Sequence, residues 1–170
     1  KCIEMSLFNK IKNKKTKKEV FMKKMLFIFM LMAGVVFAAP RFTDLGNGII
    51  KDNLTNLFWQ KCSAGQSGAN CATGSAGTYT WANAKAYCAG LSLEGKTWRL
   101  PEITELLTLT DLSRTNPAIN TGFFPATAAD WYWSNTVVAG DPSDSWDVDF
   151  YYGYSYLSQT VTSRVRCVAP

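Results

Sequence analysis

The chain has 170 residues and a formal net charge of +5, and it contains no histidine. This charge is unevenly distributed, because residues 1–38 carry +7 and residues 39–170 carry −2. A basic surface would favour nucleic acid or another polyanion as a partner, but the larger part of the chain has no basic excess. The charge balance therefore excludes nucleic-acid binding. The 132 residues from 39 to 170 have the size of a single domain.

Residues 22–38 have the three parts of a secretory signal peptide. Two lysines provide the positive flank, 13 apolar residues (25–37) form the core, and Ala38 ends the cleavage motif. Thirteen apolar residues are too few to cross a bilayer, which takes about 20. We therefore predict a periplasmic or extracellular protein that starts near Ala39 and has no stable membrane insertion. The lysine-rich residues 1–21 are interpreted as a mis-extended start or a long n-region.

Four cysteines lie in the predicted exported part, an even number that suits an oxidising compartment. Cys62 and Cys71 bracket a short loop of glycine and small polar residues, so a local disulfide is the simplest pairing. Cys88 is then left to pair with Cys167. Closing a loop of about 80 residues stabilises a fold by about 4–5 kcal/mol in the chain-entropy model. A four-cysteine zinc site is the alternative, but the spacings contain no Cys-x-x-Cys pair.

The first predicted elements are three short strands. Asn47-Gly48 is a tight-turn dipeptide between the apolar-containing segments 42–45 and 49–51, which predicts a hairpin. A second turn over 52–56 leads to a third strand at 57–59.

Two short helices are predicted after the glycine-rich loop. The first covers 81–89, with Thr80 as N-cap and Gly90 as the stop. Its inward face carries Trp81, Ala84 and Cys88. The second runs over 101–109 and begins with proline, a residue suited to a first helical turn. Its buried stripe consists of Ile103, Leu106 and Leu107.

The chain then returns to predicted strands at 131–138, 146–150, 155–160 and 164–168, with a turn at 152–154. In the second of these, Asp147 and Asp149 alternate with apolar residues, which predicts a half-buried strand with both carboxylates outward. In the last strand, Arg164 and Arg166 alternate with apolar residues and are expected on its outer face. Strands, helices and strands in this order indicate an α+β fold.

Six motifs in order carry a family resemblance: Leu57-Phe-Trp-Gln-Lys-Cys62, Thr80-Trp-Ala-Asn-Ala84, Trp98-Arg-Leu-Pro101 with Glu105-Leu106, Tyr132-Trp-Ser-Asn135, Trp146-Asp-Val-Asp-Phe150 and Val165-Arg-Cys-Val168. Over about residues 41–168 the chain resembles the Lcl C-terminal domain family, a bacterial exported domain named after a collagen-like adhesin. The resemblance implies one C-type-lectin-like or sulfatase-modifying-factor-like domain over 39–170. Such a domain has two short helices packed on small antiparallel sheets, long loops, and a disulfide from the first helix to the last strand.

The resemblance also implies a function in binding. The family's adhesin carries collagen-like repeats and is associated with sulfated glycosaminoglycans, but this chain has no Gly-X-Y repeat and no basic excess after residue 38. Arg164 and Arg166 are left as local contacts for such a polymer. We predict a non-enzymatic binding or adhesion domain for a glycan or a surface protein. The alternatives are a structural accessory module of a surface assembly and, less favoured, an enzyme acting on envelope glycans.

Catalysis is constrained by the missing histidine, which removes the usual general base and the commonest metal ligand. The glutamates after residue 38 are Glu94, Glu102 and Glu105. The last two are explained as helix-start residues, which favour the positive end of the helix dipole. Arg99 is expected to pair with a carboxylate or with backbone carbonyls beneath the second helix. No catalytic residue is predicted.

The predicted binding surface lies within 131–156, which combines aromatic side chains, carboxylates and a Gly-Asp-Pro-Ser turn at 140–143. Aromatic faces stack on sugar rings, although alternation lets only half of each run face outward, and core packing is the alternative. The proposed ligand-binding residues are Trp131, Tyr132, Tyr151, Tyr152, Tyr154, Asp147 and Asp149. Four aspartates within 141–149 suit calcium by their chemistry but match no EF-hand loop, so a solvated loop is favoured and no cofactor is predicted.

The signal-peptide interpretation is tested by N-terminal sequencing of the exported protein. We expect the sequence to begin at or near Ala39, because the small residues before it suit signal peptidase. Recovery of intact protein that retains Lys23 and Lys24 and stays in the membrane would show an anchor instead.

Overall fold

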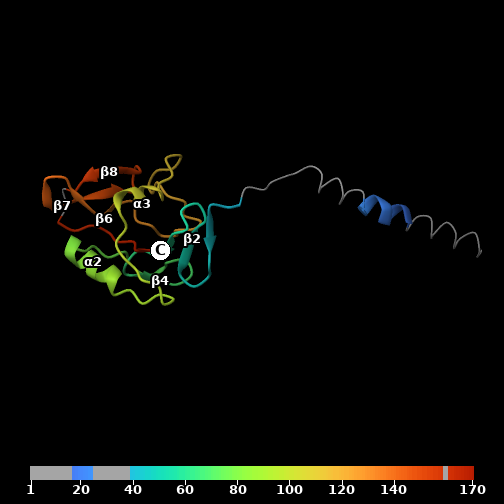
Figure 1. Cartoon of the computed structure of the whole chain (residues 1–170), viewed down its shortest axis with the longest axis horizontal. Coiled ribbons are helices and arrows are strands. Elements are labelled where there is room, and N and C mark those ends of the chain that lie inside the picture. Colours follow the sequence, from blue (N-terminus) through green and yellow to red (C-terminus); the bar gives the residue numbers. More distant parts are fainter. Residues whose placement is uncertain (1–16, 25–38, 159–160) are drawn as a thin grey trace, which may run out of the picture. The chain divides into compact units, whose positions relative to one another are not determined.

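The computed structural model describes residues 17–24, 39–158 and 161–170, so most of the predicted signal peptide lies outside the described residues. Residues 17–24 are helical. No helix in the described ranges is long and apolar enough to span a bilayer. The chain divides into two compact units, Lys1–Ala39 and Pro40–Pro170. The second unit (Figure 1) holds both disulfides and both clusters of buried core residues.

One antiparallel sheet joins the start of this unit to its end. Its strands are β1 (Phe42–Asp44), β2 (Ile49–Asp52), β3 (Phe58–Gln60) and β9 (Val168–Ala169), in the order β1-β2-β3-β9. The predicted hairpin is confirmed, with β1 and β2 paired across a turn in which Gly46 and Gly48 have φ of 78° and 86°. The final strand is much shorter than the predicted segment 164–168.

Both predicted helices are present. The first, α2 (Trp81–Ala89), matches the prediction, and the Thr80 hydroxyl accepts a hydrogen bond from the Asn83 backbone N–H. The second, α3 (Ile103–Leu107), is shorter than predicted, and its N-cap is Glu102 rather than a residue before Pro101. After α3, the backbone N–H groups of residues 108–110 each donate to the carbonyl three residues earlier, beginning with Thr108 to Glu105. This 3₁₀-type pattern tightens the end of the helix.

A second antiparallel sheet contains β6 (Trp131–Val138), β7 (Asp141–Asp149) and β8 (Tyr154–Leu157), in the order β6-β7-β8. The predicted turn at 140–143 is wrong in extent, because β7 already begins at Asp141 and pairs there with Val138. Gly140, with φ of 89°, closes the shorter turn. Two strands of two residues each, β4 (Gln66–Ser67) and β5 (Thr73–Gly74), pair antiparallel in the glycine-rich loop.

The core consists of two clusters of buried side chains. One lies between α3, β6, β7 and the first sheet, and includes Trp59, Leu106, Phe124, Tyr132 and Phe150. The other surrounds the disulfide between Cys88 and Cys167 and includes Trp98, Trp133 and Val165. In the view of Figure 1 the C-terminus is seen near the middle of the domain, directly after β9 of the first sheet. An α+β fold of short helices and small antiparallel sheets is therefore confirmed.

Both predicted disulfides are present. Cys62 is bonded to Cys71, with their Cα atoms 5.2 Å apart, and Cys88 is bonded to Cys167, with a Cα separation of 5.5 Å. The first closes the glycine-rich loop, and the second fixes α2 to the segment before β9. This covalent frame suits a small exported domain.

The prediction that Asp147 lies on an exposed strand face is wrong, because its side chain is fully buried. The chain leaves β8 at Leu157 and returns beside β6 at Arg164, and the hydroxyls of Ser158 and Ser163 hydrogen-bond to the Asp147 carboxylate. Both faces of the sheet are therefore covered at this point. Burial raises the Asp147 pKa from 3.8 to about 6, against the effect of these hydroxyls.

This buried carboxylate gives a pH prediction. Because the pKa of Asp147 is higher in the folded state than in the unfolded state, its contribution favours folding below about pH 4 and is lost as the pH rises through about 6. Replacing Asp147 with asparagine should remove this pH-dependent loss of stability, which we expect to amount to about 1–3 kcal/mol.

Urea unfolding at several pH values between 4 and 7 measures the effect. Asp144→Asn, at the exposed start of the same strand, is the matched control and should keep the parent's pH dependence. If the free energy of unfolding falls equally with rising pH in the parent and in Asp147→Asn, the pH dependence does not come from Asp147.

Candidate functional site

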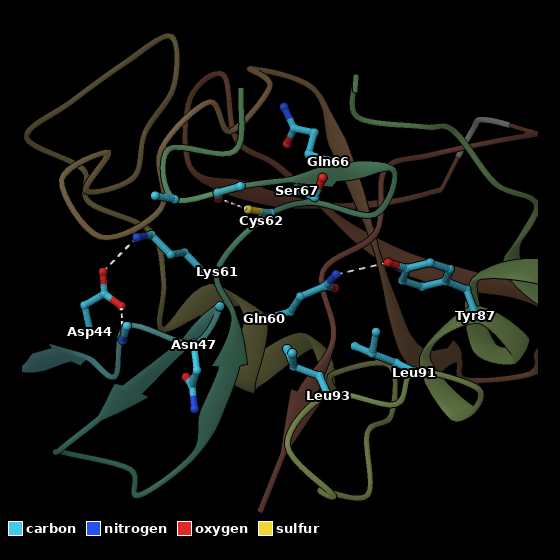
Figure 2. Close-up of a pocket in the computed structure, with 14 residues that line it drawn as sticks. Asp44, Asn47, Gln60, Lys61, Cys62, Gln66, Ser67, Tyr87, Leu91 and Leu93 are labelled. Atoms are coloured by element: carbon cyan, nitrogen blue, oxygen red, sulfur yellow. Dashed lines mark hydrogen bonds and ion pairs between the residues drawn. The ribbon is translucent and has the colours of Figure 1, made fainter. Parts of the chain in front are cut away.

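An open pocket of about 630 Å³ lies beside the first sheet. Its walls come from the β1–β2 turn, the end of β3, the loop closed by the Cys62–Cys71 disulfide, and the segment from α2 to Leu93. Figure 2 shows side chains from these segments around one opening. A pocket of this volume is in the range that holds small ligands.

An ion pair lies at the rim of the pocket. Lys61 Nζ is 2.7 Å from Asp44 Oδ2, and the Lys61 side chain is only 12% exposed. The hydrogen bond from Lys61, together with the Gly46 backbone N–H, lowers the pKa of Asp44, so the carboxylate stays ionised. The rim therefore presents donors and acceptors with no net charge.

The inner wall combines an amide, a phenol and two leucines. Gln60 Nε2 donates to the Tyr87 hydroxyl at 3.0 Å, and this bond joins β3 to α2. Leu91 and Leu93 add an apolar surface beside Gln60, as Figure 2 shows. The pocket therefore offers hydrogen-bonding groups next to a hydrophobic patch.

The disulfide loop is held in shape by a close backbone approach. A Cβ atom at Gly74 would lie 2.3 Å from the Gly65 carbonyl oxygen, and Gly74 has φ of 79°. Only glycine fits this position, so β4 and β5 can close the loop that bears Gln66 and Ser67. The small residues of this loop therefore let it fold back on itself and form one wall of the pocket.

Arg166 supports the pocket from behind. It is fully buried, and its Nη1 donates to the backbone carbonyls of Gln60 (2.9 Å) and Lys61. Its Nη2 donates to the hydroxyls of Ser63 (3.2 Å) and Thr127 (2.8 Å). The prediction that Arg166 lies on an outer face is therefore wrong. Burial lowers the pKa of this guanidinium, and neighbouring Tyr132 opposes that effect.

The residues proposed from sequence are divided between surface and core. Tyr151, Tyr152 and Tyr154 are 39%, 53% and 55% exposed, and ligand contact by them stays a prediction. Trp131 is half-buried and packs against the Tyr156 ring at 5.0 Å between centroids.

The other three proposed residues face the interior. Tyr132 and Asp147 are fully buried and Asp149 is 7% exposed, so none of them is available to a ligand at the surface. Tyr132 pairs with Val148 on the core-facing side of the sheet. The Asp149 carboxylate accepts the backbone N–H of Tyr151 at 2.7 Å.

The pocket was not predicted from the sequence. Asn47 was interpreted only as a turn residue, Lys61 stood in a family motif without a role of its own, and Tyr87 and Leu93 belonged to no motif. The one available hint was that a disulfide-closed polar loop follows directly on a strand. Nothing in the spacing indicates that the loop faces the end of α2.

Comparison with known families decides the chain's classification. The sequence matches the model of the Lcl C-terminal domain family over residues 48–169. The chain belongs to this family. No curated protein matches the sequence.

In this Lcl C-terminal domain, the glutamates of the second helix are held in structural bonds. Arg99 donates from both Nη atoms to the Glu105 carboxylate at 2.7 Å each, which confirms the expected carboxylate partner and lowers the pKa of Glu105. Glu102 accepts from Asn135 at 2.9 Å and from Thr136 at 2.5 Å. These contacts bring the Trp-Arg-Leu-Pro and Tyr-Trp-Ser-Asn motifs together.

The aspartates of β7 do not form one cluster. Asp141 and Asp144 are exposed, whereas Asp147 and Asp149 are buried. Within the described ranges, no three Cys, Asp or Glu side chains are placed to hold a metal ion together.

The role of Arg166 is tested by Arg166→Lys. An ammonium group cannot reach acceptors on both sides as the forked guanidinium does, so the variant should leave buried acceptors unpaired and lose about 2–4 kcal/mol of stability. Urea unfolding measures this loss. Arg114→Lys, at an exposed arginine, should change stability by no more than about 0.5 kcal/mol. Equal stability of both variants would show that the buried bonds are dispensable.

Proposed function

We propose that this protein is an exported, non-enzymatic binding domain of C-type-lectin-like fold that takes a neutral, hydroxyl-rich ligand, such as a carbohydrate, in the pocket beside Lys61. The observation that carries the proposal is the combination of a paired charge, uncharged polar groups and leucines around one opening of about 630 Å³. Both disulfides support export, because such bonds persist in oxidising compartments.

The chemistry of the rim suits neighbouring hydroxyl groups. A sugar hydroxyl both donates and accepts, so the Asp44 carboxylate and the Lys61 ammonium match two adjacent hydroxyls. The amide of Asn47 adds a donor and an acceptor. Leu91 and Leu93 provide an apolar surface for the C–H groups of a ring.

The same features disfavour a polyanion as ligand. Lys61 is already paired with a carboxylate, and residues 39–170 carry a net charge of −2. Arg166 is buried, and Arg164 is paired with Asp130 at 2.9 Å. Lys61, Arg164 and Arg166 therefore do not form a cluster of exposed, unpaired cations for a sulfated polymer.

The non-enzymatic part of the proposal rests on the two helix-start glutamates. Glu102 and Glu105 each accept several hydrogen bonds that hold α3 to β6 or to Arg99. A general acid or nucleophile needs a carboxyl group that is available to substrate. An enzyme acting on envelope glycans is the alternative, and turnover of such a polymer by the purified protein would favour it.

A structural accessory module of a surface assembly is the second candidate. It is favoured by β8, which lies at an edge of its sheet and exposes tyrosine and leucine side chains. This candidate needs no small ligand, so failure of the pocket proposal would leave it standing.

Binding is tested with the unit Pro40–Pro170 on a glycan array, followed by calorimetry with each glycan that binds. Asp44→Asn and Asn47→Ala should each weaken binding by about 10- to 100-fold, because the first replaces the charged carboxylate acceptor of the rim and the second removes an amide there. Both side chains are exposed, so folding should be retained, and an unchanged melting curve checks this.

Tyr152→Ala and Tyr154→Ala are the matched controls, since they alter the surface proposed from sequence and leave the pocket intact. We expect both to bind as the parent does. If the tyrosine variants lose affinity and the pocket variants do not, the site is the tyrosine surface and the pocket proposal is wrong. A domain that binds no neutral glycan also contradicts the proposal.

A further inference from the structure

The outer edge of β8 is open. On the other side of the sheet, β6 is covered, because Arg164 forms a bridge with Tyr132 and its backbone bonds to Trp131 and Trp133. Among the described residues, β8 pairs with β7 alone, in the order β6-β7-β8. An open edge displays unpaired backbone groups that can accept another strand.

The register shows which backbone groups face outward. The Ser158 N–H donates to the Ser145 carbonyl across the ladder, in the same register that pairs Leu157 with Trp146 and Tyr156 with Asp147. Hydrogen-bonded positions alternate in an antiparallel pair, so residues 154, 156 and 158 bond to β7. The N–H and C=O of Ser155 and Leu157 therefore point away from β7, and no described residue bonds to them.

The side chains of this edge are largely apolar and uncharged. Tyr154, Tyr156 and Leu157 are 55%, 46% and 46% exposed. Segment 151–158 contains no charged residue and no proline, and its pairing with β7 shows no bulge. Charged side chains, prolines and bulges protect many edge strands, and segment 151–158 has none of these three.

We propose that β8 is a self-association site, at which a second copy of this chain adds its own β8 in antiparallel orientation about a two-fold axis at Tyr156. In this register Ser155 lies opposite the partner's Leu157, and Leu157 lies opposite the partner's Ser155. All outward backbone groups of these positions then find partners. The proposal does not depend on the pocket or its ligand.

The side chains fit the same register. A two-fold axis perpendicular to the sheet keeps each face on the same side, so Tyr156 lies directly opposite the partner's Tyr156. This is a non-hydrogen-bonded pair, the kind in which cross-strand side chains are closest. The Trp131 ring already packs on Tyr156 from within its own sheet, which extends the aromatic row.

A second copy suits this edge because the strand is complementary to itself. The symmetric register satisfies the backbone and pairs aromatic with aromatic, while the absence of charge in 151–158 lets two identical edges approach without repulsion. The strand has four residues, so the interface is small and the association is weak and reversible.

The test is sedimentation equilibrium of the unit Pro40–Pro170 from about 5 to 500 µM. We expect a monomer–dimer equilibrium with a Kd on the order of 10–100 µM. Tyr156→Lys sets like charges opposite each other, and Ser155→Pro removes an outward N–H without touching the ladder to β7. Each should raise the Kd at least about tenfold. Tyr152→Lys adds the same charge to an exposed tyrosine outside β8 and should leave the Kd unchanged.

Amide hydrogen exchange provides the second measurement. Exchange of the Ser155 and Leu157 amides should slow by at least about threefold between dilute and concentrated samples, because these are the groups that the second strand would cover. A monomer over the whole concentration range overturns the proposal. So does a dimer that survives both β8 substitutions, because its interface must then lie elsewhere.

Discussion

The domain depends on residues 163–169, a largely buried segment near its end that bonds to both sheets, to α2 and to the glycine-rich loop. The segment pairs with β6 at Arg164, with the glycine-rich loop at Val165 and with β3 at β9. Its cysteine is bonded to α2, and the fully buried guanidinium of Arg166 is held by backbone carbonyls and hydroxyls. A buried cation needs such partners, since desolvation would otherwise outweigh any gain. Residues 163–169 therefore hold the two sheets, α2 and the glycine-rich loop together.

The same segment also positions residues that line the pocket. Arg166 bonds to the carbonyls of Gln60 and Lys61, which carry the amide and the ammonium group of the site, while Cys167 donates its backbone N–H to the Gln60 side chain at 3.3 Å. The wall opposite is closed by the Cys62–Cys71 disulfide. Groups held by a buried network and a covalent link lose little conformational entropy when a ligand binds, which favours affinity at a small site.

The pocket and the open edge of β8 belong to different parts of the domain, and Figure 1 shows β8 and β2 apart from each other. The two surfaces have different chemistry. The pocket has paired charge and amides suited to a hydroxyl-rich ligand, and the edge has aromatic rings and unbonded backbone groups suited to a strand. Weak self-association would present two pockets on one particle, which raises avidity for a repeating surface ligand without any new contact.

The local features of this protein could be predicted from its residues alone: the hairpin at Asn47-Gly48, the helix capped by Thr80, the α+β order, and both disulfides. Each depends on neighbouring residues or on the cysteine count. The burial of Asp147, Arg166 and Tyr132, and the meeting of Asn47, Lys61 and Leu93 in one pocket, emerged only from the folded chain. Alternation along a strand distinguishes its two faces but not which of them the rest of the chain will cover. That depends on contacts between segments far apart in sequence, because burial is a property of the packed fold.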